Sequence, residues 1–211
     1  MYLLLLTRLG QKRDVKKGMQ MTFRRYRMMD LCMFTAMMCI CEALIVLASK
    51  NWFPYEPFML SLTPAITAVV MVRWGAYAAL PALAGALALC ISSGAQPVQY
   101  LVYGAGNMLS LALLPVLRRV GWRALHENVL LAMAYGLMTA LLMQLGRAAV
   151  ALLCGMPMGV CAGFVTTDVL SLLFSILIVW ICRRLDGMLE EQRHYLKRIH
   201  EEMLRAGGMH E

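Results

Sequence analysis

The sequence has little charge, few histidines and none of the common catalytic motifs. Only 15% of its 211 residues are charged, and only four are histidines. It contains no H-E-x-x-H, no G-x-S-x-G, no nucleotide-binding loop and no acidic metal-binding cluster. The histidines all lie outside the long apolar runs, at His126, His194, His200 and His210. We therefore expect a protein that is not an enzyme and that has no cofactor and no metal, so any energy from ATP comes from another subunit.

The cysteines form no recognisable disulfide or metal-binding framework. Their number, seven, is odd, and no C-x-x-C occurs. All lie in or beside apolar runs, at Cys32, Cys39, Cys41, Cys90, Cys154, Cys161 and Cys182. We interpret them as small, reduced, buried apolar residues.

Apolar side chains are present in large excess. They make up 61% of the chain, and the mean hydropathy is +0.65, whereas ordinary soluble domains reach about 45–50% even with glycine counted. A soluble domain of this length could not bury so much apolar surface, and a disordered chain requires low hydrophobicity. The composition predicts a membrane protein.

Six apolar stretches have a length suited to transmembrane helices. They cover 31–49, 57–72, 76–92, 98–117, 128–153 and 159–182. We therefore predict an all-α membrane protein with a six-transmembrane-helix bundle over residues 31–184. A basic N-terminal segment, 1–30, precedes the bundle, and a charged helical tail, 185–211, follows it.

The net charge of +8 is concentrated at the N-terminus. Residues 1–30 carry +6, residues 31–182 carry +2, and residues 183–211 are neutral. The connections at Arg73 and at 118–123 are basic, and those on the other side have almost no positive charge. The positive-inside rule then places both termini in the cytoplasm, with the protein in the cell membrane. This distribution does not favour nucleic-acid binding, which requires a basic face on a folded domain.

The two ends of the chain allow alternative interpretations. Residues 1–17 are either an anchor lying on the membrane surface or an over-long start, with Met19 or Met21 as the true first residue. In the tail, apolar residues and one glutamine recur at heptad-like spacing, at Leu185, Leu189, Gln192, Leu196, Ile199 and Met203. This spacing predicts a solvated amphipathic helix, and we favour an exposed extension over a coiled-coil partner.

Three ionisable residues lie inside the predicted spans, where an unpaired charge is costly. Glu42 is near the middle of the first span, and Arg147 and Asp168 lie at comparable depth in the fifth and sixth. Arg147 and Asp168 either form a salt bridge that holds the bundle together or contact a polar or zwitterionic ligand in a cavity near the outer face. Gln144 shares the helix face of Arg147.

The fourth predicted span contributes a polar and aromatic stripe. Tyr100, Tyr103 and Asn107 are spaced three and four residues apart, on one helix face. Part of this stripe could be an interfacial aromatic belt, but Asn107 is too deep for that. With Gln144, Arg147 and Asp168, these three are our candidate substrate-binding residues.

Residues 51–57, before the second span, are aromatic and contain two prolines. Trp52 and Tyr55 are lid candidates over such a cavity, unless the loop simply rests among the lipid headgroups.

Small residues at packing distance occur in two spans. For Ala78, Ala82 and Ala86 we expect packing inside the bundle. The row Thr35, Cys39 and Ala43 in the first span could face lipid or a membrane partner, and we take it as a candidate docking surface.

Two runs of sequence resemble a known transporter family. The run from Ser61 to Gly85, SLTPAITAVVMVRWGAYAALPALAG, resembles the second and third helices of the substrate-binding S components of energy-coupling factor (ECF) transporters. The run from Gly94 to Asn107, GAQPVQYLVYGAGN, continues this resemblance into the fourth helix. The resemblance covers roughly residues 30–184, and its most specific element is the Arg-Trp-Gly turn followed by a small-residue helix.

The resemblance implies a six-helix subunit that binds a vitamin or related small molecule near the outer membrane face. It also implies association with a transmembrane coupling protein and two ATPase subunits. The family's first helix commonly presents an Ala-xxx-Ala pair to the coupling protein, and here Thr35-xxx-Cys39-xxx-Ala43 stands in its place. No vitamin-specific set of contacts is recognisable, so the substrate is not identified.

The sequence thus supports a substrate-capture subunit of an ECF-type importer. The first alternative is a structural scaffold of the cell-shape or division machinery, which would not need a buried polar stripe. The second is a lipid-modifying enzyme that uses Glu42 or Asp168 as a general acid or base. We disfavour the enzyme, because the sequence offers no paired carboxylate, histidine or metal motif beside either residue.

Overall fold

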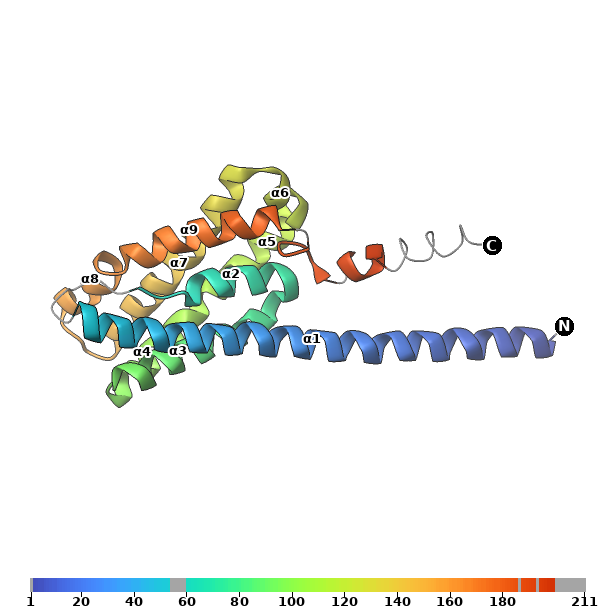
Figure 1. Cartoon of the computed structure of the whole chain (residues 1–211), viewed down its shortest axis with the longest axis horizontal. Coiled ribbons are helices and arrows are strands. Elements are labelled where there is room, and N and C mark those ends of the chain that lie inside the picture. The colour runs from blue at the N-terminus through green and yellow to red at the C-terminus, as the bar shows by residue number, and fades with distance from the viewer. Residues whose placement is uncertain (1, 54–59, 186, 193, 200–211) are drawn as a thin grey trace.

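The structure of the chain, a computed structural model, describes residues 2–53, 60–185, 187–192 and 194–199, with side chains from residue 23 onward. Within these residues the fold is helical, as predicted, and has no strands (Figure 1). The elements in chain order are α1 (Tyr2–Trp52), α2 (Thr63–Trp74), η1 (Gly75–Ala78), α3 (Ala79–Ser93), α4 (Pro97–Asn107), η2 (Met108–Leu113), α5 (Leu114–Val120), α6 (Trp122–Glu127), α7 (Val129–Leu153), α8 (Met158–Thr166) and α9 (Val169–Arg184).

In the described part of the chain, five helical segments are long and apolar enough to cross a membrane. They are Phe23–Trp52, Thr63–Ser93, Pro97–Val120, Val129–Leu153 and Met158–Arg184. These segments are typical of a multi-pass membrane protein. The second joins α2, η1 and α3, for which the sequence predicts two spans. Alone, α2 and α3 have 12 and 15 residues, fewer than the roughly 20 residues of a full span, so the count of six spans stays a prediction.

The chain reverses direction between α2 and α3, as the sequence predicts. Gly75 has φ +62°, a conformation that favours glycine. A Cβ atom added at Gly85 in α3 would lie 2.7 Å from Cγ2 of Thr63 at the start of α2. One straight helix would separate these two residues by about 33 Å, at 1.5 Å per residue. The pair therefore forms a tightly packed hairpin.

Helix α2 lies at the centre of the bundle. All 12 of its residues are buried, as expected for a helix that is apolar around its whole circumference. It contacts α1, α3, α7 and α9, and the outer helices contact one another in the order α1, α3, α4, α7, α9. Tyr135 of α7 donates a hydrogen bond from its hydroxyl to the Ala68 carbonyl of α2, at 2.9 Å. The small residues Ala78, Ala82 and Ala86 are buried, so they pack inside the bundle as expected.

Helix α1 runs as one helix from Tyr2 to Trp52 and extends well beyond the rest of the bundle (Figure 1). Residues 2–17 thus continue the axis of the first span and do not form a separate surface-lying helix. Beside the bundle, α1 exposes a stripe of large apolar side chains that suits contact with lipid, formed by Met29, Met33, Met37, Ile40, Leu44 and Leu47.

The prediction that the tail is an exposed helix from residue 185 is wrong for its first part. Helix α9 ends at Arg184, and Gly187, with φ +71°, turns the chain. Leu189 and Gln192 are 2% and 0% exposed, and the Tyr26 hydroxyl of α1 donates to Gln192 Oε1 at 3.2 Å. The reason is that the turn at Gly187 packs Met188 and Leu189 of the tail against the apolar core of the bundle. Met203 and the rest of 200–211 lie outside the described residues.

Close contact between α4 and α7 depends on Gly106. A Cβ atom there would lie 2.6 Å from the Arg147 backbone nitrogen, whereas a Cβ atom on Gly104 would meet only Leu83 Cδ2, at 3.8 Å. We expect Gly106→Ala to lower the free energy of unfolding by about 1–3 kcal/mol, because the new methyl group would overlap the backbone of α7 and push the two helices apart. Gly104→Ala, the matched control, is expected to be neutral or stabilising, since alanine favours helix. Thermal unfolding in detergent followed by circular dichroism checks both, and equal losses would contradict the prediction.

Candidate functional site

Two of the three ionisable residues predicted inside spans form a buried salt bridge. Arg147 Nη1 of α7 lies 2.9 Å from Asp168 Oδ2, and the two residues are only 3% and 4% exposed. The two residues thus lie side by side, in agreement with the comparable depth predicted for them. Because a charge with low exposure is stable only when it is paired, the pair is a fixed element of the bundle.

Arg147 is held on two further sides by residues of α4. Its Nε donates to Asn107 Oδ1 at 2.8 Å, and Asn107 Nδ2 in turn donates to the Ala82 carbonyl of α3 at 3.0 Å. The guanidinium also lies 4.9 Å from the ring centroid of Tyr103, a cation–π arrangement. The predicted stripe on the fourth span thus meets Arg147.

Asp168 lies at an interruption in the last span. The apolar stretch predicted over 159–182 corresponds to the segment Met158–Arg184, and within this segment α8 ends at Thr166 and α9 begins at Val169. Gln144 Nε2 donates to the backbone carbonyl of Asp168 at 2.9 Å, and the Ser171 hydroxyl donates to Asp168 Oδ1. Polar side chains thus hold Asp168 both by its backbone carbonyl, which also accepts a bond from the Leu172 nitrogen at 3.4 Å, and by its carboxylate.

Glu42 of α1 caps the N-terminus of α2. Its Oε1 accepts hydrogen bonds from the Thr63 backbone nitrogen at 2.8 Å, from the Thr63 hydroxyl at 2.7 Å and from the Ser61 hydroxyl at 2.6 Å. A carboxylate is favourable there because of the helix dipole. The Ser61 backbone nitrogen donates to Ser171 Oγ at 2.8 Å, so Glu42 and Asp168 belong to one network.

We call this network the buried polar cluster. It consists of Glu42, Ser61, Thr63, Asn107, Gln144, Arg147, Asp168 and Ser171. All eight residues are buried. They come from α1, α2, α4, α7 and α9 and from the turns before α2 and α9, so the cluster joins most of the bundle.

The buried polar cluster also has unused hydrogen-bonding capacity. Three buried side-chain atoms of the cluster have no hydrogen-bond partner among the described residues, namely Glu42 Oε2, Gln144 Oε1 and Arg147 Nη2. The same holds for Thr67 Oγ1, one helical turn after Thr63 on α2. Leaving such groups unpaired is costly in an apolar environment. The cluster can therefore accept further polar groups, with one donor on Arg147 and acceptors on Glu42 and Gln144.

The other predicted site residues lie at the edges of the cluster or away from it. Tyr100 is half-buried and packs near Tyr103. Trp52 is 75% exposed at the end of α1, and it contributes nothing to the buried polar cluster. Tyr55, the second lid candidate, is outside the described residues.

The small-residue row on α1 is not a free face. Thr35, Cys39 and Ala43 are all half-buried, and the Cys39 thiol lies 3.8 Å from the Ala84 carbonyl of α3. The row therefore borders the contact between α1 and α3, and the freely exposed face of α1 lies beside it.

A second buried ion pair was not anticipated from the sequence. Arg73 donates from Nε and Nη2 to the two carboxylate oxygens of Asp30, at 3.1 and 2.9 Å, and from Nη1 to the Gly187 carbonyl at 2.6 Å. The Trp74 indole donates to Asp30 Oδ2 at 2.6 Å. Arg73 lies at the predicted basic turn, and it is only 6% exposed. Two features of the sequence could have indicated this ion pair: an aspartate at the edge of a span and an Arg-Trp pair at a turn.

Comparison with known protein families, with curated proteins and with solved structures found no match to this chain. The resemblance to ECF S components therefore rests on the residues quoted above.

Proposed function

We propose that this chain is the substrate-binding subunit of an ATP-driven importer of the ECF type and has no catalytic activity of its own. In this proposal it captures a vitamin or related small molecule within the bundle. It then docks on a transmembrane coupling protein that carries two ATPase subunits. Six spans with both termini in the cytoplasm fit this role, and α1 begins and α9 ends at the same end of the bundle (Figure 1).

The observation that carries the proposal is the buried polar cluster at an interrupted span. The break at Thr167 and Asp168 lies inside an apolar segment of 27 residues, Met158–Arg184. Transporters commonly place their substrate sites at discontinuous helices, where freed backbone groups line the site. The same network has polar atoms without hydrogen-bond partners on α1, α2 and α7. Helix packing alone does not require these additional donors and acceptors.

The chemistry of these atoms indicates the class of ligand. The cluster contains one guanidinium, of Arg147, and two carboxyl groups, of Glu42 and Asp168. Its unpartnered atoms are mainly acceptors, with Arg147 Nη2 as a donor. A ligand that donates to Glu42 or Gln144 and accepts from Arg147 fits best, as a zwitterion or a nitrogen heterocycle would. Tyr103 offers an aromatic face beside Arg147.

A structural scaffold is the second candidate, and one observation favours it. Arg147 and Asp168 already neutralise each other at 2.9 Å, so the pair can serve bundle stability without a ligand. An importer would use Arg147 Nη2 as a hydrogen-bond donor to its ligand, whereas a scaffold would not.

Arg147→Lys separates these two functions. Lysine keeps a positive charge beside Asp168, but it lacks the planar fork that presents Nη2. We expect the wild-type protein, purified in detergent, to retain a small molecule that mass spectrometry identifies. For Arg147→Lys we expect about 10-fold or greater loss of affinity for that molecule, the usual effect of removing a hydrogen bond to a charged group.

The matched control is Arg118→Lys, which makes the same change at an exposed residue outside the cluster. It is expected to bind the small molecule normally. Co-expression with a coupling protein and its ATPases tests the transporter assignment separately. If no small molecule is retained and the coupling protein does not associate, the importer proposal is wrong and the scaffold is favoured.

A further inference from the structure

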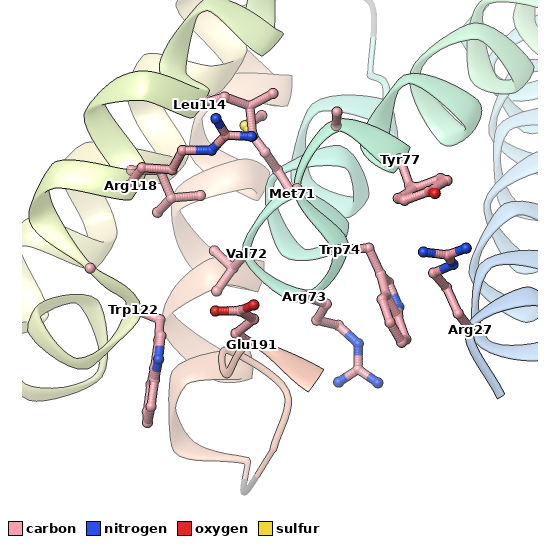
Figure 2. A pocket seen from close by; sticks show the side chains of 14 residues that line it. Arg27, Met71, Val72, Arg73, Trp74, Tyr77, Leu114, Arg118, Trp122 and Glu191 are labelled. Atoms are coloured by element: carbon pink, nitrogen blue, oxygen red, sulfur yellow. The ribbon is translucent and has the colours of Figure 1, made fainter. Parts of the chain in front are cut away.

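A cavity lies beside the Arg-Trp-Gly turn (Figure 2), at the opposite end of α2 from Thr63 of the buried polar cluster. Its volume is about 470 Å³, within the range of small-molecule sites. Its walls come from α1, α2, the turn after it, α5, α6 and the tail. The proposed import function uses none of these residues.

The cavity combines cationic and aromatic side chains. Arg27 and Arg118 line it from opposite sides, and neither makes an ion pair with a described residue. The Arg27 guanidinium lies 4.2 Å from the ring centroid of Tyr77, so its position is held without neutralising its charge. Trp74 and Trp122 add two further aromatic walls.

The remaining charged groups in the lining leave a positive excess. Arg73 is neutralised by Asp30, so it adds no free charge. Glu191, from the tail, is the acidic lining residue, and its carboxylate lies 3.6 Å from His194. Arg27 and Arg118 against Glu191 give a local charge of +1. An anionic group is therefore favoured, and Glu191 weakens its binding.

The cavity lies near the end of one apolar segment. The span that contains Arg118 ends two residues later, at Val120. The lining also has an apolar part, formed by Met71, Val72, Leu114 and Leu117. Tryptophan and tyrosine are typical of the headgroup region. A ligand there meets cationic, aromatic and apolar side chains near the end of a span.

We propose that this cavity binds an anionic phospholipid, with the headgroup phosphate at Arg118, where the net positive charge of the lining favours it, and the start of an acyl chain against the apolar wall. Basic pockets between membrane helices bind anionic headgroups in this way. The lipid would contact α1, α5 and the tail together and would stabilise their arrangement. The site is independent of the proposed import function.

The test measures phosphatidylglycerol and phosphatidylcholine retained by the full chain from mixed micelles, by native mass spectrometry. We expect selective retention of phosphatidylglycerol and about a fivefold reduction in Arg118→Gln, the usual effect of one basic residue at a membrane surface. Arg119→Gln, which removes the same charge from an exposed neighbour that does not line the cavity, is expected to retain the lipid. Glu191→Gln is expected to increase retention, because it removes the opposing charge.

Equal losses in Arg118→Gln and Arg119→Gln would overturn the proposal, because they would indicate diffuse surface charge. Unchanged retention in Glu191→Gln would also overturn it. A parallel arm adds excess inorganic phosphate. Continued retention of phosphatidylglycerol supports a lipid, whereas displacement by phosphate would overturn the lipid assignment in favour of free phosphate. Arg118 is exposed, and the side chain of Glu191 is 44% exposed, so the variants are expected to fold, and an unchanged melting temperature verifies this.

Discussion

Replacing Asp168 with leucine is expected to lower the free energy of unfolding by about 3–5 kcal/mol, the usual effect of breaking a buried salt bridge from one side. Arg147 would keep its charge at 3% exposure, with the neutral Asn107 and the Tyr103 ring beside it. The Gln144 bond to the backbone of residue 168 does not depend on the side chain, so the helix break itself should persist. Thermal unfolding in detergent measures the loss.

The double variant Arg147→Leu, Asp168→Leu tests whether the two residues act as a charge pair. Removing both charges leaves no buried ion unpaired, so we expect it to recover most of the stability lost in Asp168→Leu. It is still expected to bind no small molecule, since the donor on Arg147 is gone. A double variant as unstable as the single one would show that the pair does not act as a charge pair. Full ligand retention by the double variant would contradict the proposed site.

Replacing Asp30 with leucine is expected to have a similarly large effect, about 3–5 kcal/mol. Asp30 accepts three hydrogen bonds, two from Arg73 and one from the Trp74 indole. Because Arg73 also holds the Gly187 carbonyl, we expect the tail to detach as well. Limited trypsin digestion followed by mass spectrometry should then cleave at Arg198 faster than in the wild type.

Glu127→Leu is the control for Asp30→Leu, since it removes a carboxylate from an exposed position at the same end of the bundle. It is expected to leave both the melting temperature and the rate of tail cleavage unchanged. If Asp30→Leu lowers the melting temperature without faster cleavage, the Arg73 contact is not what holds the tail.

Hydropathy and chain length predicted the helical segments well because both are local properties. The predicted stretches 98–117 and 128–153 correspond to Pro97–Val120 and Val129–Leu153. The reversal at Gly75 was equally predictable, since glycine tolerates positive φ. The break at Thr167 and Asp168 was not predicted, although Thr166, Thr167 and Asp168 interrupt the apolar run, because polar residues such as Gln144 and Arg147 also occur in an unbroken span. The partners Gln144 and Ser171, which hold Asp168, are brought to it by packing.

The candidate site was predicted in part. Asn107, Gln144, Arg147 and Asp168 were selected because polar groups are costly inside spans, and the structure brings them together. Their partners Ser61 and Ser171 were missed, because serine is common in membrane helices and gives no signal by itself. The pairing of Arg73 with Asp30 was not predicted, because sequence position alone does not show whether a charge at a turn faces water or an aspartate of another helix.

The sequence by itself determined that this chain is a helical membrane protein and which segments are apolar, because composition and periodicity set the solvent that each segment requires. Only the tertiary structure decided which charges neutralise one another. Arg147 meets Asp168, and Arg73 meets Asp30, across helices far apart in the chain. Those pairings depend on the rotation and crossing of packed helices, which no local pattern specifies. The atoms left without partners by that packing are the basis of the proposed function.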